Sequence, residues 1–182
     1  GTNDAAVLGS ATVNLTETNA VRATGGTLTI SDIDNPATFV PQVATVGTYG
    51  TFAINAAGAW TYTASSAHNE FVAGTTYVET FNVSSVDGTP TSVTVRILGT
   101  NDAPVAVDNS VATNEDSVLT IAPATLLGND TDPDGDALTI TSVQGAVNGT
   151  VALVGGNVVF TPAANYNGPA SFDYTVQDNG TT

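Results

Sequence analysis

The residues best suited to chemistry form a short acidic run from Asn129 to Asp136, which reads Asn-Asp-Thr-Asp-Pro-Asp-Gly-Asp. Its carboxylates, on Asp130, Asp132, Asp134 and Asp136, recur at every second position around a Pro-Asp-Gly turn, so they repel one another unless a cation lies among them. Ca²⁺ fits best, because it takes about six to eight oxygen ligands, whereas Mg²⁺ requires a stricter octahedron. The run therefore predicts a calcium site. The alternative is a solvated acidic turn, since Asp, Pro and Gly are ordinary turn residues.

The run is not an EF-hand loop. Asp130, Asp132, Asp134 and Gly135 match the opening of such a loop, but Thr141 stands where the bidentate Glu is needed. The flanking segments also alternate like strands and show no helical periodicity.

Composition restricts the classes of function. The chain has 17 acidic residues against 2 Arg and no Lys, with a formal net charge of −15. Nucleic acid is therefore excluded as a partner, since phosphate binding needs cationic groups. No apolar run reaches the ~20 residues that span a bilayer, so direct membrane insertion is not expected. There is no Cys and a single histidine, His68, which we interpret as a surface-loop residue. No nucleophile motif or phosphate loop accompanies it, and we expect no enzyme.

A repeated tetrapeptide divides the chain. Gly-Thr-Asn-Asp occurs at 1–4 and again at 99–102, and each copy opens a stretch of alternating apolar and polar residues. We predict an all-β chain of two tandem Greek-key β-sandwich domains joined end to end, over 1–100 and 101–182. Expected strands in the first domain are 6–15, 26–31, 37–46, 48–54, 59–64, 76–86 and 91–98, with a hairpin turn at 55–58 and Trp60 and Tyr62 in the core. Those in the second are 104–112, 117–122, 137–144, 149–154, 157–161 and 170–177, so its last strand is expected to be missing.

The Greek-key order decides which acidic loops meet. Successive strands alternate in direction, so the connections collect at the two ends of each sandwich. One expected site lies at the start of the first domain, where Asp32 and Asp34 meet Asp87, Asn3 and Asp4. The other is expected at the junction, with candidate ligands from both domains and the linker: Glu17, Glu70, Asn101, Asp102, Asp132, Asp134, Asp136 and Asp178. Glu70 is the weakest member, because its loop can form a helical turn directed elsewhere.

Several segments resemble repeats of large bacterial surface proteins. The first domain is similar to a VCBS repeat, through the segments 27–32 (Thr-Leu-Thr-Ile-Ser-Asp), 49–52 (Tyr-Gly-Thr-Phe), 58–63 (Gly-Ala-Trp-Thr-Tyr-Thr) and 97–102 (Ile-Leu-Gly-Thr-Asn-Asp). The second resembles a bacterial cadherin-like or Ig-like repeat, through 103–106 (Ala-Pro-Val-Ala), 114–116 (Asn-Glu-Asp), 127–136, 165–168 (Asn-Tyr-Asn-Gly) and 172–176 (Phe-Asp-Tyr-Thr-Val).

The resemblance implies an extender segment of a large secreted adhesin of the RTX type, displayed on a bacterial cell surface in adhesion or biofilm formation. In such proteins Ca²⁺ between successive domains stiffens the rod, and the immediate partners are neighbouring repeats of the same polypeptide. Homophilic contacts and host-surface glycans or proteins are further expected partners. The alternative is a ligand-binding adhesion module that recognises glycans or another adhesin.

Overall fold

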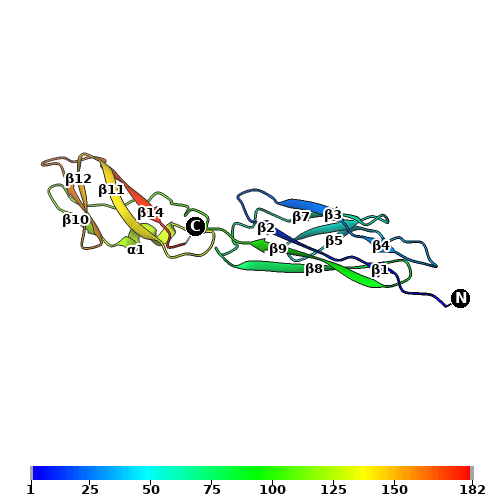
Figure 1. Cartoon of the computed structure of the whole chain (residues 1–182). Coiled ribbons are helices and arrows are strands. Elements are labelled where there is room, and N and C mark those ends of the chain that lie inside the picture. Colours follow the sequence, from blue (N-terminus) through cyan, green and yellow to red (C-terminus); the bar gives the residue numbers. More distant parts are fainter. Residues whose placement is uncertain (1, 181–182) are drawn as a thin grey trace. The chain divides into compact units, whose positions relative to one another are not determined.

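The computed structural model describes residues 2–180 and consists almost entirely of strands and turns (Figure 1). The chain divides into two compact units, Gly1–Thr100 and Asn101–Thr182. The prediction of an all-β chain with β-sandwich units is confirmed. Among the described residues, no helix is long and apolar enough to cross a membrane.

Two main sheets build the first unit. One has the order β3-β7-β6-β5 and contains β3 (Ala23–Thr27), β7 (Ala59–Ala64), β6 (Gly50–Ile54) and β5 (Gln42–Val46). The other has the order β2-β9-β8, in which β9 (Pro90–Leu98) runs parallel to β2 (Ala11–Thr16) and antiparallel to β8 (Thr76–Ser84). A short pair joins β1 (Val7–Leu8) to β4 (Ile30–Ser31). The last strand of the unit, β9, is therefore the central strand of its sheet.

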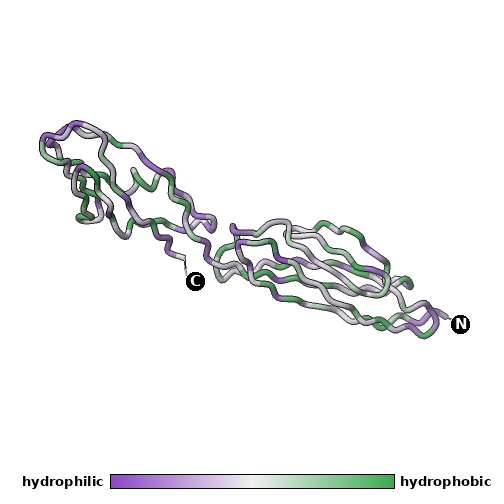
Figure 2. Tube along the Cα trace, turned by 90° about the horizontal axis from the view of Figure 1, so that it is seen from above, coloured by the Kyte–Doolittle hydropathy of each residue, from purple (hydrophilic) through white to green (hydrophobic). Residues whose placement is uncertain are grey.

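The core of the first unit follows the alternation of its sequence. Val93, Val95 and Ile97 on β9 are at most 1% exposed, and Trp60 and Tyr62 on β7 are 5% and 0% exposed, so the prediction that both aromatic residues lie in the core is confirmed. Figure 2 shows that the strongly hydrophilic stretches of this unit lie mainly at the ends of its strands. The hairpin turn at 55–58 is also present: the Gly58 N–H donates to the Asn55 carbonyl at 3.0 Å, with Gly58 at φ +83°. The acidic loops of this unit therefore lie at the ends of its strands.

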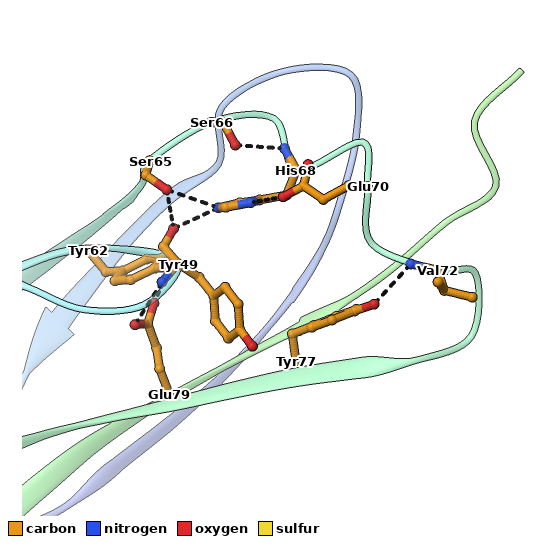
Figure 3. A network of polar contacts seen from close by, with 9 residues as sticks. All are labelled: Tyr49, Tyr62, Ser65, Ser66, His68, Glu70, Val72, Tyr77 and Glu79. Carbon is orange, nitrogen blue, oxygen red and sulfur yellow. Dashed lines mark hydrogen bonds and ion pairs between the residues drawn. The ribbon is translucent and has the colours of Figure 1, made fainter. Parts of the chain in front are cut away.

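His68 is not the surface residue that the sequence suggested, since it is only 6% exposed. Its ring stacks on Phe71 with centroids 4.4 Å apart. Its Nε2 lies 2.7 Å from the Tyr49 carbonyl oxygen (Figure 3). Its Nδ1 lies 2.8 Å from Glu70 Oε1. His68 is thus buried against Phe71 of its own loop and Tyr49 of an earlier turn. A single histidine in a loop sequence does not reveal this burial.

The second unit has two smaller sheets. One has the order β10-β13-β12, with β10 (Leu119–Ile121), β13 (Asn157–Pro162) and β12 (Gly149–Val154). The other pairs β11 (Thr139–Val147) with β14 (Ser171–Gln177). Between β10 and β11 the chain forms α1 (Pro123–Leu126) and a 3₁₀ turn at Leu127–Asn129. Ile121, Leu126 and Val158 are the buried residues of its hydrophobic cluster, a smaller core than that of the first unit.

The strand expected at 104–112 does not form. Only Val105 makes a bridge there, to Thr131. The rest of the segment is held through side chains, because the Val107 N–H donates to Asp130 Oδ1 at 2.8 Å and Asn109 Nδ2 donates to Asn129 Oδ1 at 2.9 Å. The alternating pattern is present, but within the part of the chain that the structure describes no strand pairs with this segment beyond the Val105 bridge.

Candidate metal sites

The acidic loop of the second unit gathers three carboxylates. One oxygen each from Asp132, Asp134 and Asp136 lies within 4.8 Å of the others, and residues 2–180 contain no second cluster of this kind. Asp132 organises the loop, because its Oδ1 accepts the N–H groups of Asp134 at 2.9 Å and Asp136 at 3.1 Å. Such turns, in which a side chain accepts from the backbone two residues on, are typical of Asp. The loop therefore holds its like charges together by local hydrogen bonds.

Two further segments of the same unit converge on this loop. The Asp102 N–H donates to Asp134 Oδ2 at 2.8 Å, and Asn101 Nδ2 donates to Asp178 Oδ2 at 3.3 Å. After β14 the backbone comes so close that a Cβ placed on Gly180 would overlap Asn101 Oδ1 and lie 2.5 Å from Asp136 Oδ2. Residues 101–102, 132–136 and 178–180 thus surround one small volume.

The oxygen atoms around this volume fit a hard cation. Asn101 Oδ1, Asp132 Oδ2 and Asp134 Oδ1 are buried and have no hydrogen-bond partner. Residues 101–182 contain no Lys or Arg that could neutralise them. Partial burial, together with the charges of Asp132, Asp134 and Asp178, raises the pKa of the Asp136 carboxyl above its usual value. Buried oxygens without donors are costly, and an ion that takes six to eight oxygen ligands removes that cost. We refer to Asn101, Asp102, Asp132, Asp134, Asp136 and Asp178 as the acidic cluster.

A similar arrangement begins the first unit. Asp32 Oδ1 accepts the N–H groups of Asp34 at 3.0 Å and Asn35 at 2.8 Å, as Asp132 does for its own loop. The Asp4 N–H donates to Asp34 Oδ2 at 3.2 Å, as Asp102 does to Asp134. Asn35 Nδ2 donates to Asn3 Oδ1, and Asp32 Oδ2 is buried without a partner. In both copies of Gly-Thr-Asn-Asp, the N–H of the final Asp therefore donates to the second Asp of an Asp-x-Asp loop.

Asp87, the fifth candidate at this end, is held by its own turn. Its Oδ2 accepts the Ala6 N–H at 2.9 Å and its Oδ1 accepts the Ser85 hydroxyl and the Thr89 N–H. The Ser85 bond, followed by the backbone donors of Ala6 and Thr89, holds the pKa of the Asp87 carboxyl well below its usual range. Both oxygens of Asp87 thus have donors, so the contacts of Asp87 are those of a turn cap.

Each of the remaining candidates makes its contacts within its own unit. Glu17 is 1% exposed, and its Oε2 accepts the N–H and hydroxyl of Thr100 at 2.9 and 3.1 Å, while its Oε1 has no partner. Glu70 has a side chain 64% exposed and pairs with His68. Asp130 uses Oδ1 for the Val107 N–H and Oδ2 for the Tyr174 hydroxyl, at 2.8 and 3.2 Å. Glu17 therefore resembles the cluster residues in its orphaned buried oxygen, whereas Asp130 is engaged by the fold.

Three residues at these sites, Asn35, Asn179 and Gly180, were not among the ligands expected from the sequence. Asn35 contacts Asn3 and Asp34, Asn179 Oδ1 accepts the Ala137 N–H at 2.7 Å, and Gly180 allows the close approach described above. The signal for the last two was present, because Asn179 and Gly180 directly follow the candidate ligand Asp178.

Comparison with known proteins gives two family matches. Residues 3–99 match the family described as "Bacterial cadherin-like domain", and residues 100–182 match "Cadherin-like domain". Among curated proteins, none matches the chain. Among solved structures, an endo-fucoidan hydrolase of glycoside hydrolase family 107 is similar over 97% of this chain and 27% of its own, at 20% identity and a TM-score of 0.35. The chain thus spans about a quarter of that enzyme, and this likeness carries no argument about function.

Proposed function

Since the chain belongs to the bacterial cadherin-like domain family, we propose that it is a non-enzymatic, calcium-binding extender segment of a large secreted bacterial surface adhesin. The observation that carries the proposal is the acidic cluster, where three buried oxygens on Asn101, Asp132 and Asp134 have no donor. The likeness of the first unit to VCBS repeats, an RTX-type parent and a role in biofilm formation are parts of the same proposal.

The residues of the acidic cluster have different roles in the proposed site. Asp132, Asp134 and Asp136 supply most of the negative charge, and Asn101 supplies a neutral amide oxygen from the linker. Asp132 also fixes the loop, and its second oxygen stays directed into the cluster because the first accepts two backbone N–H groups. Bound Ca²⁺ would supply the positive charge that this unit lacks.

The chain connection gives the cluster a mechanical role. Thr100 is held by Glu17 through two hydrogen bonds, and the next residues, Asn101 and Asp102, belong to the cluster. An ion bound by Asn101 and Asp102 would therefore restrain the linker directly after the residue that the first unit holds. Without the ion, repulsion among the carboxylates loosens residues 101–102. We propose that calcium stiffens the segment in this way.

Calorimetric titration of the full chain with Ca²⁺ tests the binding. We expect affinity of about 10⁻⁴–10⁻³ M, as in extracellular calcium modules. Asp134→Asn should reduce the number of ions bound or weaken the site by about tenfold or more, since it removes one charge and leaves the fold's hydrogen bonds in place. Glu115→Gln is the matched control, because Glu115 is an exposed acidic residue of the same unit outside the cluster. Equal calcium binding by wild type and Asp134→Asn would contradict the assignment.

The stiffening is tested separately. Paired spin labels, one in each unit at exposed positions, should give a narrower distance distribution with Ca²⁺ than with EDTA. Asp134→Asn should show the broad distribution under both conditions. If Ca²⁺ binds and the distribution stays broad, the calcium site stands and the extender mechanism is wrong.

A further inference from the structure

The end strand of the larger sheet in the first unit, β5, extends beyond the packed core. Its sheet has four strands, whereas the facing sheet β2-β9-β8 has three. Just before β5 the chain is tied to β8, by the bridge between Phe39 and Ser85 and by the bond from Gln42 Nε2 to the Asn82 carbonyl at 2.8 Å. After Gln42 every residue of β5 is exposed. Within residues 2–180, no strand pairs with β5 on the side away from β6.

This edge is apolar and has no charge. Val43 is 89% exposed and Val46 is 81% exposed, more than any other large apolar side chain on a strand of the described residues. The sequence from 36 to 69 contains no Asp, Glu, Lys or Arg. Edge strands that remain unpaired commonly carry charged residues, which block pairing with other chains. The strand β5 lacks this protection, so it is a template for strand pairing.

A bulge brings both valines to the same face of the sheet. Gln42 and Thr45 pair with buried residues of β6, and Val46 pairs with an exposed one. Between Gln42 and Thr45 the strand has one residue more than β6, so Val43 lies on the outer face together with Val46. Thr45 therefore stands between two outward-facing valines.

The spacing of these residues makes the edge complementary to itself. In an antiparallel pair of β5 strands with a two-fold axis through Thr45, Val43 of each chain lies opposite Val46 of the other. No charged side chain enters this contact. The net charge of −15 acts against association of two copies through their acidic loops, so an uncharged edge is the part of the surface where two copies meet at least cost.

We propose that two copies of this chain associate through β5, antiparallel about Thr45, so that their larger sheets form one continuous sheet. The contact is small, because β5 has only 5 residues, and we expect a dissociation constant of about 10⁻⁴ M. The proposal adds a side-to-side contact between copies to the extender role, and it does not depend on calcium binding by the acidic cluster.

Sedimentation equilibrium of the full chain in EDTA, at concentrations on both sides of this value, tests the association. Val46→Lys should raise the dissociation constant about tenfold, because each dimer would contain two charges at the paired edge. Val21→Lys is the matched control: Val21 is 55% exposed and lies outside the strands, and the change in net charge is the same. Added NaCl should strengthen the wild-type dimer, since it screens the repulsion between the two chains.

Cysteine cross-linking tests the register, because the chain has no Cys of its own. Thr45→Cys should form a disulfide-linked dimer under mild oxidation, since the two-fold axis places the two Cβ atoms about 4.5–5.5 Å apart. Thr61→Cys is the control: Thr61 is also exposed, on β7 inside the same sheet, and should cross-link about tenfold more slowly or not at all.

A wild-type chain that stays monomeric at every concentration would overturn the proposal. Equal dimerisation of Val46→Lys and Val21→Lys would overturn it too, in favour of a contact elsewhere on the chain. Equal cross-linking of Thr45→Cys and Thr61→Cys would show that two copies do not pair through β5.

Discussion

At the scale of single residues, the first unit shows how a buried carboxylate is stabilised without a cation. Glu79 is 9% exposed, and its Oε1 accepts the Tyr62 hydroxyl at 2.5 Å while its Oε2 accepts the Tyr49 N–H at 3.2 Å (Figure 3). Burial, with help from the bond to Glu79, raises the pKa of Tyr62 far above its usual value, so the phenol stays a donor. Glu79 thus has donors for both oxygens, whereas Asp132 and Asp134 each keep one buried oxygen without a donor.

Tyr62→Phe should therefore destabilise the first unit by about 1–3 kcal/mol, because it leaves a buried oxygen of Glu79 without a donor. Tyr77→Phe is the control: the Tyr77 hydroxyl accepts the exposed Val72 N–H at 3.1 Å, so its loss should cost less than about 1 kcal/mol. Urea unfolding of both variants measures the difference. Equal costs would contradict the role assigned to the Tyr62 hydroxyl.

Two carboxyls should give the units opposite pH responses in EDTA. The pKa of Asp136 is raised above its usual 3.8, so the folded second unit holds a proton more tightly than the unfolded chain. The stability that the Asp136 carboxyl contributes to the second unit should therefore increase as the pH falls from neutral through the raised pKa. The pKa of Asp87 is lowered, so the stability it contributes is present above 3.8 and is lost as the pH falls below that value. Thermal melting across pH checks both signs, and Asp136→Asn should abolish the first effect.

At the scale of elements, β9 shows how strongly one strand determines a sandwich. It pairs with β8 over 90–98 and with β2 over 93–98, and its alternate side chains from Val93 to Ile97 are fully buried. Ile97→Ala should cost about 2–5 kcal/mol, the range for truncating a buried aliphatic residue. The adjacent Leu98 is 38% exposed, and Leu98→Ala should cost no more than about 1 kcal/mol. Denaturant unfolding that finds similar costs at both positions would contradict the observed strand orientation.

At the scale of the whole molecule, the two units differ in how much of their stability can come from packing. The buried hydrophobic cluster of the first contains Phe39, Phe52, Tyr62 and many others. Among residues 101–180, the fully buried members of the second cluster are Ile121, Leu126 and Val158, and partly buried residues pack against them. Small cores need a further source of stability, and metal binding is a common one.

Calorimetric melting of the full chain in EDTA should thus give two transitions, with the second unit unfolding at the lower temperature. Saturating Ca²⁺ should move that lower transition further than the upper one, because ligand at about 100 times its dissociation constant adds about 2.7 kcal/mol per site. Asp134→Asn should reduce the shift of the lower transition alone. A calcium shift confined to the upper transition would contradict this assignment.

The sequence by itself determined the features that depend on local pattern. Alternation of apolar residues identified β12 at 149–154 and β7 at 59–64 to the residue, and the turn at 55–58 followed from its Asn and Gly. The spacing of the acids in 130–136 likewise identified the loop in which the structure finds its carboxylate cluster. These features are local because side-chain direction in a strand and the chemistry of a turn are fixed within a few residues.

Only the tertiary structure decided which groups find partners. Residues 104–112 alternate like a strand, but a strand also needs a neighbour for its backbone hydrogen bonds, and within residues 2–180 this segment has only the bridge from Val105 to Thr131. His68 is buried because Phe71 and Tyr49 pack against it. Asp130 accepts from distant donors on both oxygens, whereas Asp132 accepts local N–H groups on one oxygen and has no donor for the other. Strand pairing and the burial of polar groups depend on residues far apart in the chain, so no local sequence pattern predicts them.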